Sequence, residues 1–192
     1  MIKETNNKDL YALMKELIDQ QGYSLLDVGC GLCLNLDKFE CPVIIGIDVH
    51  RPYLTNRANL SAHIIPMHMD ARDMSLYFLP KSLSVVLFND TLEHFNKNEA
   101  LYMLKRAEQI ASHKVIVFTP RGFFPQDDYD HFQLKGEMYQ AHRSGWEPEE
   151  FENLGYDVLV LKDFHDARNS SFRASFGENH PPVDALLAWK NV

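Results

Sequence analysis

The chain has 192 residues, 45% of them hydrophobic and 24% charged, which is the composition of an ordinary globular protein of one domain. No apolar run approaches the ~18 residues of a membrane span, and the formal net charge of −8 argues against an extended nucleic-acid surface, which needs clustered Lys and Arg. The polar run Met1 to Asn7 lacks the apolar stretch of a signal peptide. We therefore expect a cytoplasmic protein without a membrane or nucleic-acid partner.

Strands and helices are expected to alternate along most of the chain. Short apolar runs predict strands, and apolar residues at helical spacing predict helices. In chain order, the pattern predicts a helix over 8–20, a strand over 24–28, a short helix over 32–39, a strand over 43–47, a helix over 52–60, strands over 63–67 and 84–88, a helix over 97–112, a strand over 114–119, a short helix over 148–154, and strands over 156–161 and 184–190. The strand over 63–67 is the weakest, because Pro66 cannot donate to a ladder.

The connections between the first five strands average a dozen or more residues, which is typical of parallel strands joined by right-handed crossovers. The sequence therefore predicts one α/β domain over residues 1–192. Its sheet is expected to be doubly wound, mostly parallel and seven-stranded, with helices on both faces and an antiparallel last strand.

Small and acidic residues follow the first four predicted strands. They are Gly29-Cys30-Gly31, Asp48-Val49, Asp70-Ala71 and Asn89-Asp90, in chain order. In doubly wound sheets a ligand lies outside the carboxyl ends of the strands. The two glycines let the backbone turn sharply and approach a ligand, and Asp48, nineteen residues beyond Gly29, can accept hydrogen bonds from two ribose hydroxyls.

These segments resemble the motifs of the class I S-adenosylmethionine-dependent methyltransferases over nearly the whole chain. Leu25-Leu26-Asp27-Val28-Gly29-Cys30-Gly31 is similar to the first motif, Gly46-Ile47-Asp48 to the second, Asp70-Ala71 to the third and Asn89-Asp90-Thr91-Leu92-Glu93-His94 to the fourth. The resemblance implies S-adenosyl-L-methionine as cofactor, with Asp48 on the ribose, Asp70 at the adenine amino group and the glycines near the methionyl part. The implied cofactor-binding residues are Asp27, Gly29, Cys30, Gly31, Asp48, Val49, Asp70, Ala71, Asn89 and Asp90.

Other interpretations of the glycine loop fit less well. A nicotinamide dehydrogenase would need a glycine at position 34, where this chain has Leu34. Cys30 and Cys33 form a C-x-x-C that would suit redox work or half of a zinc site, but no second pair follows. The chain departs from many methyltransferases at Cys33, where they have a third glycine.

His94 is the predicted catalytic residue, as a base that takes a proton from the acceptor near neutral pH. Its alternative role is packing beside the cofactor or at a helix start. Asp90, Glu93 and His94 also match in spacing a metal-binding trio of ubiquinone-pathway O-methyltransferases. The same pattern is frequent in metal-free relatives, so no metal is predicted.

The segment 120–146 interrupts the alternation of strands and helices and is too long for an ordinary connection. It mixes aromatic, acidic and basic side chains, so we expect it to form the acceptor site, although a solvated surface loop has the same composition. The candidate acceptor-binding residues are Tyr129, His131, His142 and Arg143.

The sequence thus predicts methyl transfer from S-adenosylmethionine to a small-molecule acceptor. The motifs that mark nucleic-acid-methylating relatives are missing, since no Asp- or Asn-Pro-Pro-aromatic run follows the fourth strand. The alternative is a catalytically silent partner that binds the cofactor and regulates another enzyme.

Overall fold

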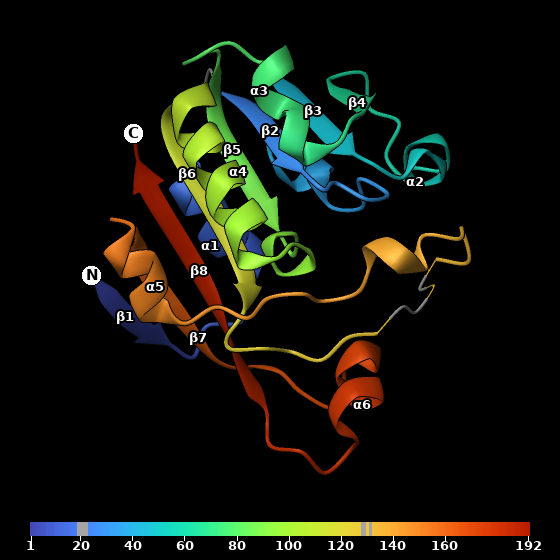
Figure 1. The fold of residues 1–192 in the computed structure, drawn as a ribbon, viewed down its shortest axis with the longest axis vertical. Helices are drawn as coiled ribbons and strands as arrows, with labels where there is room; N and C mark the ends of the chain where they lie inside the picture. The colour runs from blue at the N-terminus through green and yellow to red at the C-terminus, as the bar shows by residue number, and fades with distance from the viewer. Residues whose placement is uncertain (19–22, 128–129, 131) are drawn as a thin grey trace.

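The computed structural model describes residues 1–18, 23–127, 130 and 132–192, and Figure 1 shows a twisted sheet with helices packed against it. Within that part of the chain, eight strands form one sheet in the order β1-β7-β8-β6-β5-β2-β3-β4. They are β1 (Ile2–Thr5), β2 (Ser24–Val28), β3 (Val43–Asp48), β4 (Ile64–His68), β5 (Leu83–Asn89), β6 (Ala111–Pro120), β7 (Asp157–His165) and β8 (Val183–Asn191). Strand β8 is antiparallel to β6 and β7, and the other neighbours are parallel. The predicted α/β class and the antiparallel last strand are confirmed.

Strand β1 is an additional, eighth strand that the sequence pattern did not reveal. It pairs in parallel with β7, from Ile2 opposite Val158 to Thr5 opposite Leu161. Charged residues separate Ile2 from Thr5, so the run lacks the apolar continuity of the inner strands. An edge strand does not need that continuity, because only part of its surface is covered. Ile2 alone provides the contact with the core.

The helices are α1 (Leu10–Leu17), α2 (Arg51–Thr55), α3 (Met74–Tyr77), α4 (Lys97–Ile110), α5 (Pro148–Asn153) and α6 (Ser170–Phe176), with 3-10 turns η1 (Leu36–Lys38), η2 (Ala71–Asp73), η3 (Leu92–His94) and η4 (Glu137–Tyr139). Helix α2 is shorter than the expected 52–60, because the Ala58 N–H donates to the Leu32 carbonyl at 2.9 Å and turns the chain away. Helix α4 begins at an Asn96–Glu99 capping box, as helices of this length favour. Among the described residues, no helix has the length and apolar character to cross a membrane.

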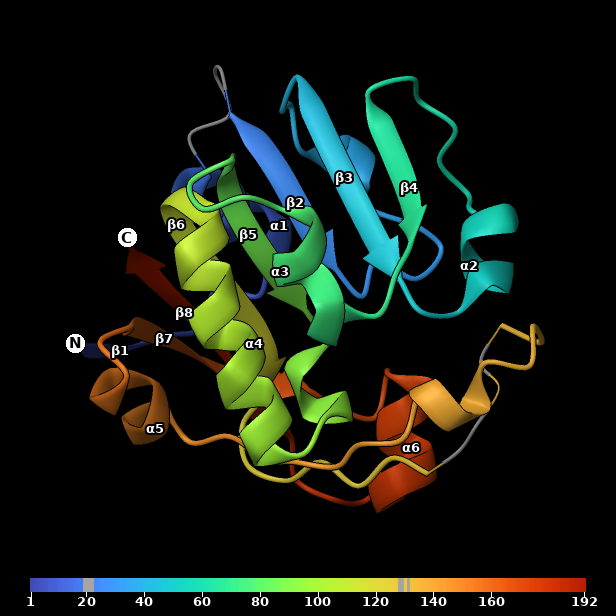
Figure 2. The same cartoon turned by 45° about the horizontal axis from the view of Figure 1, so that its top comes forward.

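Two apolar layers cover the sheet. Side chains alternate along each strand, so Leu26 belongs to the apolar layer that contains residues of α3, α4 and α5, while Leu25 belongs to the layer on the opposite face, with residues of α1 and η1. In Figure 2, α3 and α4 lie in front of the sheet and α1 lies behind it. The inner strands are therefore buried on both faces, which explains their continuous apolar runs.

The parallel strands β2 to β6 end at the same edge of the sheet. Figure 2 shows the connection between β6 and α5, and helix α6, lying beyond this edge. The loops that follow β2, β3, β4 and β5 consequently face the segment 120–146.

Candidate functional site

A cavity of about 840 Å³ lies at the carboxyl edge of the sheet, between the strand-end loops and the segment 120–146. All residues predicted for cofactor binding line it, as do His94, His142 and Arg143 of the acceptor side. Its volume is in the upper range for small-molecule sites. The strand order, rather than proximity in sequence, brings these residues together.

The glycine loop after β2 requires glycine for two physical reasons. Gly29 has φ +76° and Gly31 φ +52°, in the left-handed region that favours glycine. A Cβ on Gly29 would also lie 2.6 Å from Cγ2 of Thr91, whose hydroxyl donates to the Val28 carbonyl at 2.7 Å. Around Gly31 a Cβ would meet nothing within 4 Å, so this part of the backbone faces open space. The loop therefore presents bare backbone to a ligand.

Cys33 occupies the position at which many methyltransferases have a third glycine. Its φ is +56°, so the left-handed backbone that favours glycine is retained. The Cys33 N–H donates to the Cys30 carbonyl at 2.9 Å, and the two sulfurs lie 3.6 Å apart. The departure from the motif therefore leaves the shape of the loop unchanged, and both thiols are free.

Asp48 connects the end of β3 to the glycine loop. Its Oδ2 accepts the Gly31 N–H at 2.9 Å, and its Oδ1 accepts the His50 N–H at 2.7 Å. Burial raises the pKa of the Asp48 carboxyl, and these two N–H groups oppose that shift. Each carboxylate oxygen keeps a further lone pair for a ligand hydroxyl. Asp48 does not cap α2, since His50 holds the N-cap position of that helix.

Asp27 is a buried carboxyl beside the cavity, with 5% of its surface exposed. Its Oδ1 has no hydrogen-bond partner among the described residues. Burial, with a smaller effect of the Asp48 charge, raises the pKa of Asp27 to about 7. An unpaired buried carboxyl is unfavourable unless a proton or a cation neutralises it. The position therefore suits a cationic group of a ligand.

Asp70 lies at the cavity but is already paired. Arg72 donates to it from Nη2 at 2.6 Å, from Nε at 3.0 Å and from its backbone N–H at 2.9 Å. The Arg72 guanidinium, the largest influence, lowers the pKa of Asp70. Arg72 also contacts Glu99 at 3.1 Å. A ligand amino group must therefore use the lone pairs that Arg72 leaves, while the Ala71 backbone remains at the cavity.

Hydrogen bonds join the two halves of the segment 120–146. The His142 N–H donates to the Gln126 carbonyl at 3.0 Å, and Gln126 Nε2 donates to the Gln140 carbonyl at 2.8 Å. Arg143 is exposed and lines the cavity. The other two candidate acceptor residues, Tyr129 and His131, lie outside the described residues.

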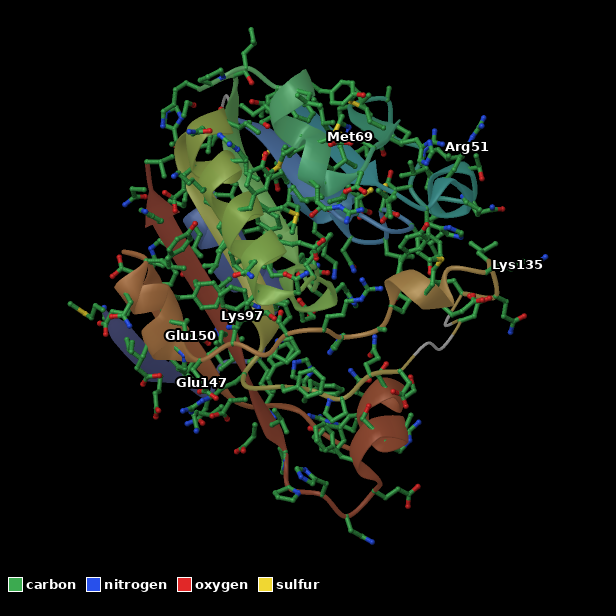
Figure 3. The ribbon with its side chains drawn as sticks, viewed as in Figure 1. Arg51, Met69, Lys97, Lys135, Glu147 and Glu150 are labelled. Atoms are coloured by element: carbon green, nitrogen blue, oxygen red, sulfur yellow. The ribbon has the colours of Figure 1, made fainter. Side chains whose placement is uncertain are left out.

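The end of this segment is anchored beside α4 and α5. Figure 3 shows Lys97, at the start of α4, next to Glu150 of α5. The Lys97 Nζ lies 3.4 Å from the centre of the Trp146 ring and 2.7 Å from Glu150 Oε1. Trp146 is buried and stacks on Phe151. Trp146 thus belongs to the core, and its contacts hold the end of the segment 120–146 against α4 and α5.

His94 meets His142 in the wall of the cavity. Their ring centres lie 4.9 Å apart at an angle of 71°. Burial lowers the pKa of His94, and burial together with the His94 charge lowers the pKa of His142 to about 4. Both imidazoles are therefore neutral near pH 7. Glu93 is 2% exposed beside them, and its Oε2 accepts the Thr119 hydroxyl at 3.1 Å.

Sequence reasoning missed the contribution of the β7–α6 region. His165, Asn169 and Ser171 line the cavity, and Phe124 packs edge-on against the His165 ring at 5.5 Å. Asn169 caps α6 by accepting the N–H groups of Ser171 and Phe172. The signal that could have revealed α6 is an Asn, a frequent helix-capping residue, followed by aromatic residues at helical spacing.

Comparison with known proteins identifies the fold. No protein-family model and no curated protein sequence matches the chain. A provisionally assigned methyltransferase of Bacillus halodurans superposes with a TM-score of 0.65 and 15% identity, over 96% of this chain and 99% of that one. An S-adenosylmethionine-dependent methyltransferase of Mesorhizobium loti gives 0.63 and 13%, over 96% and 98%. The plantazolicin methyltransferase BamL, solved with a triazolic desmethylPZN analogue and SAH, gives 0.59 and 15%, over 96% and 82%. The chain therefore has the fold of these methyltransferases.

Proposed function

We propose that the protein transfers a methyl group from S-adenosylmethionine to a small-molecule acceptor. The observation that carries this proposal is the convergence of all four strand-end motifs on one cavity, with Asp48 bonded to the glycine loop. The fold shared with S-adenosylmethionine-dependent methyltransferases supports it, as does the SAH bound to BamL. The negative net charge supports a small acceptor rather than a polyanion.

The residues present fit this cofactor. Asp48 offers two carboxylate oxygens for the ribose hydroxyls, and the bare backbone of Gly29 and Gly31 admits the methionyl part. The unpaired Asp27 carboxyl provides a counter-charge for the cationic groups of the molecule. Val49, Ala71, Asn89 and the cavity-exposed Asp90 complete the proposed site.

When bound, the cofactor supplies a methyl group that is already electrophilic, because it is attached to a sulfonium. The task of the protein is then to orient the acceptor and to exclude water, which is worth about 7–11 kcal/mol in favourable cases. We place the acceptor against the segment 120–146, which closes the cavity opposite the strand ends. His142 and Arg143 contribute to this wall.

Calorimetric titration with S-adenosylmethionine and S-adenosylhomocysteine tests the cofactor assignment. We expect micromolar binding with one site per chain for at least one of the two molecules. Absence of binding to a protein shown to be folded by circular dichroism would refute the proposed function. Binding without any S-adenosylhomocysteine formation against pools of small metabolites would instead identify the silent-partner alternative.

In the metal-free protein we propose His94 as the proton acceptor for the nucleophile. Its neutral ring has one nitrogen free for a proton, since Nδ1 lies 3.3 Å from the Ala141 carbonyl. We expect His94→Ala to slow turnover by about 10²-fold or more with unchanged cofactor affinity, as for removal of a general base. The exposed histidine variant His63→Ala is the control. Full activity of His94→Ala in steady-state assays would remove His94 from this role.

A further inference from the structure

Glu93, His94 and His142 form a group of potential metal ligands at the acceptor side of the cavity. One ligand atom from each residue lies within 4.8 Å of the other two. Glu93 and His94 belong to η3 after β5, whereas His142 comes from the segment before α5. The group differs from the trio that sequence spacing indicates, because His142 takes the place of Asp90.

The hydrogen bonds of both histidines orient their lone pairs. His94 Nδ1 lies 3.3 Å from the Ala141 carbonyl, and His142 Nδ1 lies 2.8 Å from the Phe124 carbonyl. A carbonyl can only accept, so each Nδ1 carries the proton and each Nε2 carries a lone pair. A backbone carbonyl on the far nitrogen is the usual outer partner of a metal-binding histidine.

Glu93 adds an unpaired carboxylate oxygen to these two nitrogens. Its Oε1 is buried and has no hydrogen-bond partner within the described part of the chain, while Thr119 donates to Oε2. Each of the three residues thus keeps an available electron pair, and nothing among the described side chains donates a hydrogen bond to Glu93 Oε1. Arg143, the charged group that acts on His94, is exposed and donates to the Met138 carbonyl. Burial, followed by the Asp90 charge, raises the pKa of the Glu93 carboxyl, so either a proton or a metal cation can fill this position.

We propose that Glu93, His94 and His142 bind a divalent transition-metal ion, with zinc as the reference ion. Two nitrogens and one carboxylate oxygen are ligands that zinc and its neighbours accept, and three protein ligands leave a coordination position for a further molecule. Ligand atoms about 2.1 Å from zinc lie about 3.4 Å apart, so zinc binding draws together ligand atoms that are separated by up to 4.8 Å in the metal-free protein.

The position of the metal site indicates a role in the proposed methyl transfer, and this role rests on the proposed function. All three residues line the cavity that we assign to cofactor and acceptor. An acceptor hydroxyl on the open coordination position would become more acidic, as metal-bound oxygen ligands do. The proposal therefore selects acceptors with a metal-binding hydroxyl, and His94 acts as a ligand rather than a base when the ion is bound.

Metal binding is tested on the full-length protein after removal of metal with a chelator. We expect zinc calorimetry to give one site per chain, and Co²⁺ to give the visible absorption bands of a nitrogen- and oxygen-ligated ion. Glu93→Gln keeps the shape of the side chain, and His142→Ala removes one nitrogen. Each variant is expected to weaken zinc binding at least 10-fold and to abolish the cobalt bands. His63→Gln, at an exposed histidine outside the cavity, is expected to bind zinc like the wild type.

The results separate this inference from the proposed function. Absence of zinc binding to the wild type, or binding that Glu93→Gln and His142→Ala leave unchanged, overturns the metal site. If S-adenosylmethionine still binds in that case, the proposed function stands. Zinc binding that depends on these residues without any cofactor binding supports the metal site and overturns the proposed function alone.

Discussion

Replacing Asp48 with alanine is expected to weaken S-adenosylmethionine binding by about a hundredfold, which corresponds to about 2.7 kcal/mol. Two effects contribute. The variant removes the proposed acceptor of two ribose hydroxyls, and hydrogen bonds to a charged group are worth about 1.5–3 kcal/mol each. It also releases the Gly31 and His50 N–H groups, which Asp48 holds at 2.9 Å and 2.7 Å. The glycine loop thereby loses one of its contacts with β3, while the Gly29 and Cys30 N–H groups still donate to the Ile47 carbonyl at 2.9 Å and 3.0 Å.

Calorimetry on the folded variant measures this change. Asp37→Ala is the matched control, because Asp37 is an exposed aspartate in η1, a few residues beyond the same loop. We expect the control to bind like the wild type. Equal affinity of Asp48→Ala and Asp37→Ala would reject the assignment of Asp48 to the ribose. A folded Asp48→Ala is judged by an unchanged circular dichroism spectrum.

Replacing Asp27 with asparagine is expected to stabilise the cofactor-free protein, increasingly so as the pH rises. Burial, as the main cause, raises the pKa of Asp27 to about 7 in the folded state, against about 3.9 in an unfolded chain. Below about pH 4 the carboxyl is protonated in both states. Between about pH 4 and pH 7 it ionises only on unfolding, so the free energy of unfolding falls as the pH rises. Asparagine is isosteric and neutral, so the variant does not undergo this decrease in the free energy of unfolding.

The difference in unfolding free energy between Asp27→Asn and the wild type isolates this group. The pKa values of the neighbouring Tyr11 and Cys30 are raised above their ordinary values, so both groups stay protonated in either protein over this pH range. Each pH unit is worth about 1.36 kcal/mol, so the difference should grow by up to about 3 kcal/mol from pH 5 to pH 7 and then level off. Urea unfolding at several pH values provides the measurement. Parallel curves for the two proteins would show that Asp27 ionises normally.

The strand-end loops that line the cavity could be predicted from the sequence because their determinants are local. A buried apolar run predicts a parallel strand, and the residue after such a strand must lie at the carboxyl edge of the sheet. Gly29, Asp48 and Asn89 could therefore be placed at one ligand site without any knowledge of side-chain contacts. The engagement of Asp70 by Arg72 could not, because it depends on the turn geometry of η2.

The acceptor side depends on long-range packing. His142 reaches His94 only because the segment 120–146 crosses the edge of the sheet and is anchored again through Trp146. No hydrophobic period predicts such a path, since the described residues between β6 and α5 contain no regular element apart from η4. The same holds for His165. It lines the cavity from the end of β7, which β8 and β6 separate from β5 in the sheet.

The sequence by itself determined the α/β class, the strand-end motifs and the residues of the cofactor loops, because strand periodicity and turn chemistry act over a few residues. Only the tertiary structure decided that Glu93, His94 and His142 meet and that the polar run Ile2–Thr5 adds an eighth strand. It also decided that Asp27 is buried, with no hydrogen-bond partner for Oδ1 in the described part of the chain. Those outcomes depend on which distant segments pack together. The whole core contributes to the free energy of that packing, so no local sequence pattern predicts it.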